Sequence, residues 1–204
     1  MIQSRLLLIT DRKACGERTL EQVVEASCKN GVRLVQFREK DVSPRDAFGY
    51  AKALREITVK YGAKLIINSF LDIALAVDAD GIHLSSTGIP IHEIRKQKPN
   101  LLLGKSTHSL SEALEAQLQG ADYIQFGPVY DTPSKKIYGQ AQGVEKLSVI
   151  TSKLHIPVFA VGGITPENAS ACMNAGAAGI AVIRSLMTAK DISRTLQSFN
   201  LALS

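Results

Sequence analysis

The 204-residue chain has no tryptophan, and aromatic side chains make up only 5% of it. Its core must therefore be built mainly from aliphatic side chains. Hydrophobic residues as a whole reach 45%, which is ordinary for a globular protein. No low-complexity tract or composition break divides the sequence, so we expect one domain over residues 1–204.

Cysteines are few, and long apolar runs are missing. Cys15, Cys28 and Cys172 are odd in number and lack paired spacing, which argues against a disulfide framework and a zinc site. No apolar stretch is long enough to span a bilayer, and the opening residues predict a strand rather than a signal peptide. We expect a cytoplasmic protein with no membrane partner.

The formal net charge of +5 is not concentrated in any one segment. The sequence has no run of Lys and Arg and no basic-aromatic stripe, so we expect no nucleic acid partner. The excess of positive charge suits either an ordinary basic surface or an anionic small substrate.

Eight short β-rich runs alternate with amphipathic stretches of helical period. Apolar strands separated by helices indicate a parallel sheet that is buried on both faces. Eight repeats in a chain of this length predict a closed (β/α)8 TIM barrel of the α/β class, with an open doubly wound sheet as the alternative. The runs are residues 6–10, 34–38, 64–68, 81–84, 101–106, 123–127, 157–161 and 179–183.

Several helix boundaries are also marked. Ser109 followed by Glu112 predicts a capping box at the start of one helix. Four glycines predict helix ends. They are Gly31, Gly62, Gly120 and Gly176.

In either architecture, functional groups lie at the carboxyl ends of the strands. After the second strand, alternation predicts Gln36, Arg38 and Lys40 on one face and Glu39 on the other. Two cations at the mouth of a barrel need an anion, either a bound phosphate or an internal salt bridge.

Three further strands end in polar residues. We expect Asn68 either to bind a ligand or to cap the next helix, and His83 to be a core histidine. Ser106 and His108 are predicted to face the mouth. His108 is a candidate acid or base, with helix capping as the alternative.

The segment after the sixth run, residues 127–143, is the longest loop. Its Thr132, Ser134 and Lys135 form a cluster suited to phosphate or pyrophosphate, unless the lysine is incidental on a surface loop.

Paired glycines follow the seventh strand, and a cation follows the eighth. Gly162 and Gly163 allow backbone N–H groups to approach an anion closely. Ile183 and Arg184 come from the loop that often completes a phosphate site in such barrels. We expect this pair of loops to bind a phosphate group.

Five stretches, found in the same order and covering most of the chain, together resemble the thiamin phosphate synthase/TenI family. Any one of them alone is a weak indication, and the combination is highly specific. They are QFREK at 36–40, residues 67–84, 104–113 and 120–135, and PVFAVGGITPEN at 157–168 followed by AGAAGIAVI.

The resemblance implies a TIM barrel that acts in thiamin biosynthesis. Family synthases join a pyrimidine methyl pyrophosphate to a thiazole phosphate; the pyrimidine ionises to a carbocation, which the thiazole nitrogen captures. The resemblance implies that the pyrimidine or its pyrophosphate is contacted by Gln36, Arg38, Lys40, Asn68, Ser106 and Lys135. It implies that the thiazole phosphate is contacted by Thr132, Ser134, Gly163 and Ile183. Arg184 departs from the family pattern and is expected to add a cation beside the thiazole phosphate.

Two positions depart from the family. Ser69 and Gly88 stand where family synthases carry the aspartates that hold Mg²⁺, an ion that needs anionic oxygen ligands. We therefore expect severely weakened Mg²⁺ binding and no other cofactor. Asp72 and Asp80 are predicted to serve a helix start and a strand start instead.

The TenI branch shows a similar loss, but its tautomerase chemistry uses a histidine where this chain has Pro128. A tautomerase remains a hypothesis here, with His108 as the candidate substitute base. We favour a TenI-like protein that binds thiazole phosphate and thiamin phosphate with weak or no Mg²⁺-dependent synthase activity. The alternatives are a functional synthase and a non-catalytic regulator that binds a phosphorylated ligand. The oligomeric state, a homo-oligomer included, stays open.

Overall fold

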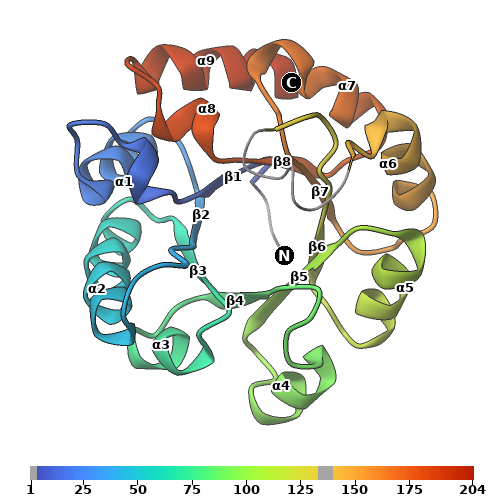
Figure 1. Cartoon of the computed structure of the whole chain (residues 1–204), viewed down its shortest axis with the longest axis horizontal. Coiled ribbons are helices and arrows are strands. Elements are labelled where there is room, and N and C mark those ends of the chain that lie inside the picture. Colours follow the sequence, from blue (N-terminus) through green and yellow to red (C-terminus); the bar gives the residue numbers. More distant parts are fainter. Residues whose placement is uncertain (1–3, 133–139) are drawn as a thin grey trace.

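The computed structural model describes residues 4–132 and 140–204. Eight parallel strands follow one another around a closed barrel, with β8 paired to β1, and helices surround the barrel on the outside (Figure 1). The prediction of a (β/α)8 TIM barrel is confirmed, and the open sheet is excluded. No helix in this part of the chain has the length and apolar character to cross a membrane.

All eight predicted strands are present, each within one residue of its predicted bounds. The strands are β1 Leu6–Ile9, β2 Leu34–Phe37, β3 Lys64–Asn68, β4 Gly81–Leu84, β5 Leu102–Thr107, β6 Tyr123–Phe126, β7 Val158–Val161 and β8 Gly179–Val182. The helices are η1 Arg12–Ala14, α1 Leu20–Lys29, α2 Pro44–Lys60, α3 Leu71–Ala76, α4 Ile91–Gln97, α5 Leu110–Leu118, α6 Gly143–Thr151, α7 Pro166–Asn174, α8 Arg184–Met187 and α9 Ile192–Leu203.

Strand alternation divides the core into two layers. Inward-facing residues such as Leu7, Ile66 and Phe159 pack inside the barrel, and their neighbours along each strand pack against the helices. Phe37 belongs to the outer layer, where its ring lies 6.4 Å from that of Tyr50. Polar side chains such as Gln36 and Asn68 follow the apolar residues at the carboxyl ends of the strands, which makes the mouth of the barrel the first place to look for a ligand site.

The predicted helix ends are confirmed by backbone geometry. Each of the four glycines follows a helix with a positive φ, the left-handed conformation that suits glycine. The values are 105° at Gly31, 63° at Gly62, 91° at Gly120 and 85° at Gly176.

The capping box predicted at α5 is only half formed. The Ser109 hydroxyl accepts a hydrogen bond from the Glu112 backbone N–H at 3.2 Å, as predicted. The Glu112 carboxylate, however, accepts from the backbone N–H of His108 at 2.7 Å rather than from that of Ser109. The second half of the prediction is therefore wrong, because the chain turns one residue earlier and presents a different donor.

Two aspartates stabilise the opposite end of the barrel in the same way. Asp80, just before β4, accepts from the Leu65 backbone N–H at 2.8 Å and from the Arg55 guanidinium at 2.6 Å. Asp122, just before β6, accepts from the corresponding groups of β5 and α4 at 2.7 and 2.6 Å. Asp80 therefore ties a strand start to a helix, as the sequence predicted, and lies far from the mouth.

We expect Asp80→Ala to lower the free energy of unfolding by about 1–3 kcal/mol, because a buried backbone N–H loses its acceptor. Urea denaturation measures this, and Asp122→Ala should cost a similar amount. Ligand binding at the mouth should be unchanged in both variants. A loss below about 0.5 kcal/mol would contradict the role assigned to these carboxylates.

Candidate active site

A cavity of about 330 Å³ opens at the carboxyl ends of the strands. Residues from seven of the eight strands, or from the loops that follow them, line it, and six of these residues were predicted to lie at the mouth. The predicted residues among them are Gln36, Arg38, Lys40, Asn68, Ser106 and Ile183. The structure thus brings the polar ends of β2, β3 and β5 to one place, as expected for a parallel barrel.

A second cavity of about 250 Å³ adjoins the first. It is lined by Thr132, the Gly162–Gly163 turn and Arg184, and it shares Val161 and Ile183 with the first cavity. The phosphate loops predicted after β7 and β8 therefore do meet. The two cavities are therefore neighbours at the same end of the barrel.

A chain of side-chain amides crosses the first cavity from β6 to β3. The Gln125 side-chain amide donates to Oε1 of Gln36 at 2.6 Å, and the Gln36 amide donates to Oδ1 of Asn68 at 3.2 Å. The Asn68 amide in turn donates to the Ser69 hydroxyl at 2.9 Å. Gln36 and Gln125 are only 1% and 4% exposed. Asn68 does not cap α3, because the N-cap residue of that helix is Phe70 and no side chain caps it. The Asn68 amide lines the cavity instead.

Sequence reasoning missed Gln125. It is the one amide side chain in the run Tyr123–Phe126, and it lines the first cavity. A glutamine at an inward position of an otherwise apolar strand was the available indication. Its part in the amide chain depends on the hydrogen bond to Gln36 across the barrel, which strand order alone does not reveal.

The Gly162–Gly163 turn is held tightly. Both residues have positive φ, 101° and 63°, and a Cβ on Gly163 would lie 2.6 Å from the Asp131 carbonyl oxygen. The Asn168 side chain donates to the Gly163 carbonyl at 3.0 Å and accepts from the Thr165 N–H at 2.9 Å. Only glycine fits here, and the fixed turn keeps its backbone close to the second cavity.

Glu39 does not lie on the opposite face from Arg38, as strand alternation predicted. Strand β2 ends at Phe37, so the pleat does not continue, and Glu39 lines the first cavity with Arg38 and Lys40. Its carboxylate accepts from the Arg12 backbone N–H at 3.0 Å. Arg38 itself takes part in no ion pair among the described residues, which favours an external anion for it.

His108 is turned toward the backbone. Its Nδ1 lies 2.5 Å from the Gly127 carbonyl oxygen, and it lines neither cavity. This contact suits a residue that ties the end of β5 to the loop after β6. The predicted Ser134 and Lys135 fall outside the described residues.

Comparison with known proteins agrees with this geometry. A sequence model described as thiamine monophosphate synthase matches residues 6–186. A thiamine-phosphate synthase of Clostridium novyi is 42% identical over 199 residues, covering 96% of this chain and 98% of the relative. That of Chloroflexus aurantiacus is 40% identical over 95% of this chain and 89% of the relative. The chain belongs to the thiamine monophosphate synthase family.

Structural comparison leads to the same family. The thiamine phosphate pyrophosphorylase of Pyrococcus furiosus superimposes with a TM-score of 0.89 at 36% identity, over 98% of this chain and 95% of that one. The resemblance noted in the sequence is thereby confirmed. The relatives bear the synthase name, and the tautomerase hypothesis finds no support in them.

The residues at the expected Mg²⁺ position do not fit that ion. Ser69 offers a neutral hydroxyl that already accepts from the Asn68 amide, and Gly88 offers no side chain. Asp80 lies at the other end of the barrel. No group of three His, Cys, Asp or Glu suited to a metal occurs in residues 4–132 and 140–204. A hard divalent cation would lack the anionic oxygens it prefers.

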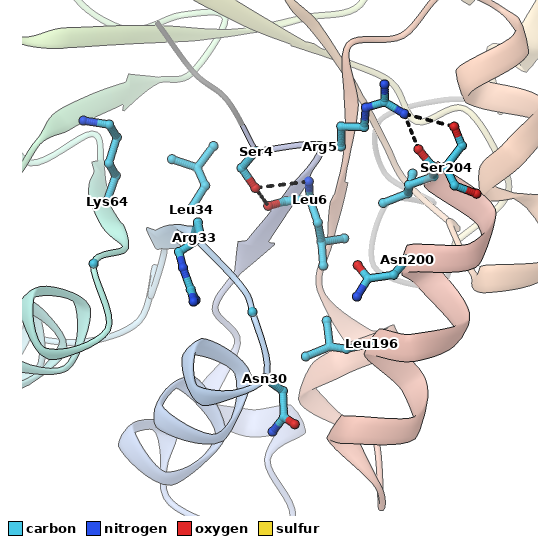
Figure 2. A pocket seen from close by; sticks show the side chains of 13 residues that line it. Ser4, Arg5, Leu6, Asn30, Arg33, Leu34, Lys64, Leu196, Asn200 and Ser204 are labelled. Atoms are coloured by element: carbon cyan, nitrogen blue, oxygen red, sulfur yellow. Dashed lines mark hydrogen bonds between the residues drawn. The ribbon is translucent and has the colours of Figure 1, made fainter.

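A larger cavity, of about 610 Å³, lies at the opposite end of the barrel between β1 and α9 (Figure 2). Its cations have local partners. Arg5 donates to the carbonyls of Leu203 and Ser204, Arg33 donates to that of Cys28 at 2.8 Å, and Lys64 pairs with Asp80. These contacts cap helix ends and hold strand starts, so the cavity is explained by the structural role of its residues.

Burial raises the pKa of the Glu39 carboxyl, against the opposing effect of hydrogen bonds from Thr10 and the Arg12 backbone. The pKa of Glu39 is then higher in the folded than in the unfolded state. The stability that the carboxyl contributes is therefore fully present below the unfolded pKa and is lost as pH rises through the folded pKa. As pH rises from the unfolded to the folded pKa of Glu39, the wild type loses stability and the Glu39→Gln variant does not, so the variant should gain relative to the wild type. Urea denaturation at a series of pH values measures the difference.

Asp41→Asn is the matched control. Hydrogen bonding from Lys13 lowers the pKa of Asp41, so here the wild type should gain stability over the variant as pH rises. Slopes of the same sign for the two variants would contradict the assignment for Glu39.

Proposed function

We propose that this protein is a thiamine-phosphate synthase that joins a pyrimidine methyl pyrophosphate to a thiazole phosphate. The observation that carries the proposal is the pair of adjoining cavities with a common wall at Val161 and Ile183. The pyrimidine substrate carries a pyrophosphate group, and the thiazole substrate carries a single phosphate. The first cavity presents Arg38 and Lys40, and the second presents the glycine turn and Arg184, so each has groups for one anion.

The cavities suit the two halves of the reaction. The bond between the pyrimidine methylene carbon and oxygen breaks, and pyrophosphate leaves with the electron pair. The lone pair of the thiazole nitrogen then forms the new C–N bond. Positive side chains around the first cavity stabilise the charge that develops on the departing oxygen, and the adjoining cavities bring the methylene carbon close to the thiazole nitrogen.

In this assignment Arg38 and Lys40 bind the pyrophosphate, Ser106 donates a hydrogen bond to it, and the amide chain through Gln36 and Asn68 orients the pyrimidine. An amide offers both a donor and an acceptor, as an aminopyrimidine edge requires. Thr132 and the Gly162–Gly163 turn bind the thiazole phosphate. Because the Mg²⁺ position lacks carboxylates, the chain's own cations carry the charge neutralisation.

A second candidate is a protein that binds thiazole phosphate and thiamin phosphate but turns over slowly. One observation favours it: Ser69 and Gly88 leave the expected metal position without carboxylates. The synthase names of the relatives favour the first candidate.

A double variant, Ser69→Asp with Gly88→Asp, separates the two candidates. Ser69 has φ of 66°, a conformation that Asp tolerates. A Cβ at Gly88 would lie 3.2 Å from the Ser85 carbonyl oxygen, a tight contact that the backbone must relieve by a small shift. If the protein is a working synthase, product formation with both substrates and Mg²⁺ should be substantial in the wild type and change by less than about tenfold in the variant. Negligible wild-type turnover with a rise of orders of magnitude would select the second candidate.

Arg38→Met tests the anion site. Loss of a charged hydrogen-bond donor should lower kcat/KM for the pyrimidine substrate by about 10- to 100-fold, with little change in KM for the thiazole phosphate. Steady-state kinetics with each substrate varied in turn gives both values. Lys153→Met, which removes an exposed cation after α6, is the control and should leave both unchanged. Equal loss toward both substrates would place Arg38 elsewhere in the mechanism.

A further inference from the structure

Three residues in the barrel interior form a hydrogen-bonded column that ends at the first cavity. The Tyr123 hydroxyl lies 3.1 Å from His83 Nδ1, and His83 Nε2 lies 2.9 Å from the Ser106 hydroxyl. Tyr123 and His83 are 0% and 1% exposed, whereas Ser106 lines the cavity. The column thus leads from a fully buried phenol to a group that can touch a ligand.

Strand register explains how the column forms. His83 of β4, Gly104 of β5 and Tyr123 of β6 are direct neighbours across the sheet. A Cβ on Gly104 would lie 2.2 Å from the Tyr123 ring, so the missing side chain lets the phenol cross β5 and reach His83. Ser106 stands two residues beyond Gly104, on the same inward face. The glycine is therefore part of the arrangement.

We assign the direction of the hydrogen bonds from the phenol. Burial raises the pKa of Tyr123, so the phenol stays protonated, and the hydrogen bond that its hydroxyl makes among the described residues is to His83 Nδ1, which therefore acts as the acceptor. In the neutral imidazole the proton then resides on Nε2, which donates to the Ser106 oxygen. With its oxygen accepting from His83, the Ser106 hydroxyl has its own hydrogen available for a ligand.

We propose that His83 and Tyr123 are positioning residues that make Ser106 a hydrogen-bond donor to a phosphoryl oxygen in the first cavity. The proposal rests on the function proposed above, in which that cavity binds a pyrophosphate group. The column therefore selects a ligand group that accepts a hydrogen bond from Ser106. A ligand group that can only donate would meet a Ser106 oxygen that already accepts from His83.

The first test measures the proton directly. In protein labelled with ¹⁵N-histidine, the His83 resonances, assigned by their loss in His83→Gln, should show the proton on Nε2 in the wild type. In Tyr123→Phe, which removes only the donor, the signal should shift toward the other tautomer or a mixture. A wild-type proton on Nδ1 would overturn the inference whatever the protein's activity.

The second test measures coupling to ligand binding, with inorganic pyrophosphate as the probe in calorimetry. Ser106→Ala and Tyr123→Phe should each weaken binding by about threefold to tenfold, the range for one neutral hydrogen bond. The double variant should bind no more weakly than Ser106→Ala, because Tyr123 acts only through Ser106. Tyr61→Phe, which removes an outer phenol hydrogen-bonded to Glu25, is the control and should bind like wild type.

The outcomes separate the two proposals. Additive losses in the double variant, or Tyr123→Phe binding like wild type, would overturn the positioning role while the synthase function stands. Wild-type protein that binds pyrophosphate with the expected coupling but makes no product would overturn the synthase function alone. Wild-type protein that binds no pyrophosphate would overturn both. Thermal unfolding of each variant checks that the barrel remains folded.

Discussion

The pairing of β8 with β1 is the constraint on which everything at the mouth depends. It closes the sheet, so the carboxyl ends of all eight strands lie on one ring rather than along an open edge. Gln36 and Gln125 are 89 residues apart in sequence, yet they share a hydrogen bond across the barrel. Only a closed parallel barrel brings these side chains together, and the two cavities arise at that same end.

Side-chain volume inside the barrel decides which polar groups can meet. Gly104 leaves room for the Tyr123 ring, which reaches His83 and through it Ser106. The glycine turn after β7 works in the same way, because the loop after β6 packs where a Cβ would lie. At both places a missing side chain positions a functional group, and close packing of the interior makes the position rigid.

Charge at the mouth differs from the arrangement that the family resemblance implies. The hydroxyl of Ser69 accepts from Asn68 and thereby ends the amide chain, where a carboxylate would add negative charge. Arg38 and Lys40 line a cavity together with three carboxylates, those of Asp11, Glu39 and Asp41. Burial raises the pKa of Glu39, and hydrogen bonding from Lys13 lowers that of Asp41. Serine at position 69 leaves the local field more positive than an aspartate there would, which favours a polyanionic ligand.

The sequence by itself determined the strands, the helix ends and the barrel, because each follows from local periodicity and from glycine geometry at single positions. It also located the polar strand ends at residues 36–40, 68 and 106. Tertiary structure alone decided that Glu39 and Gln125 line the cavity, that His108 turns toward Gly127, and that Tyr123 contacts His83. These outcomes depend on where a strand stops pairing and on which residues face each other across the sheet, and neither is encoded within one segment of the chain.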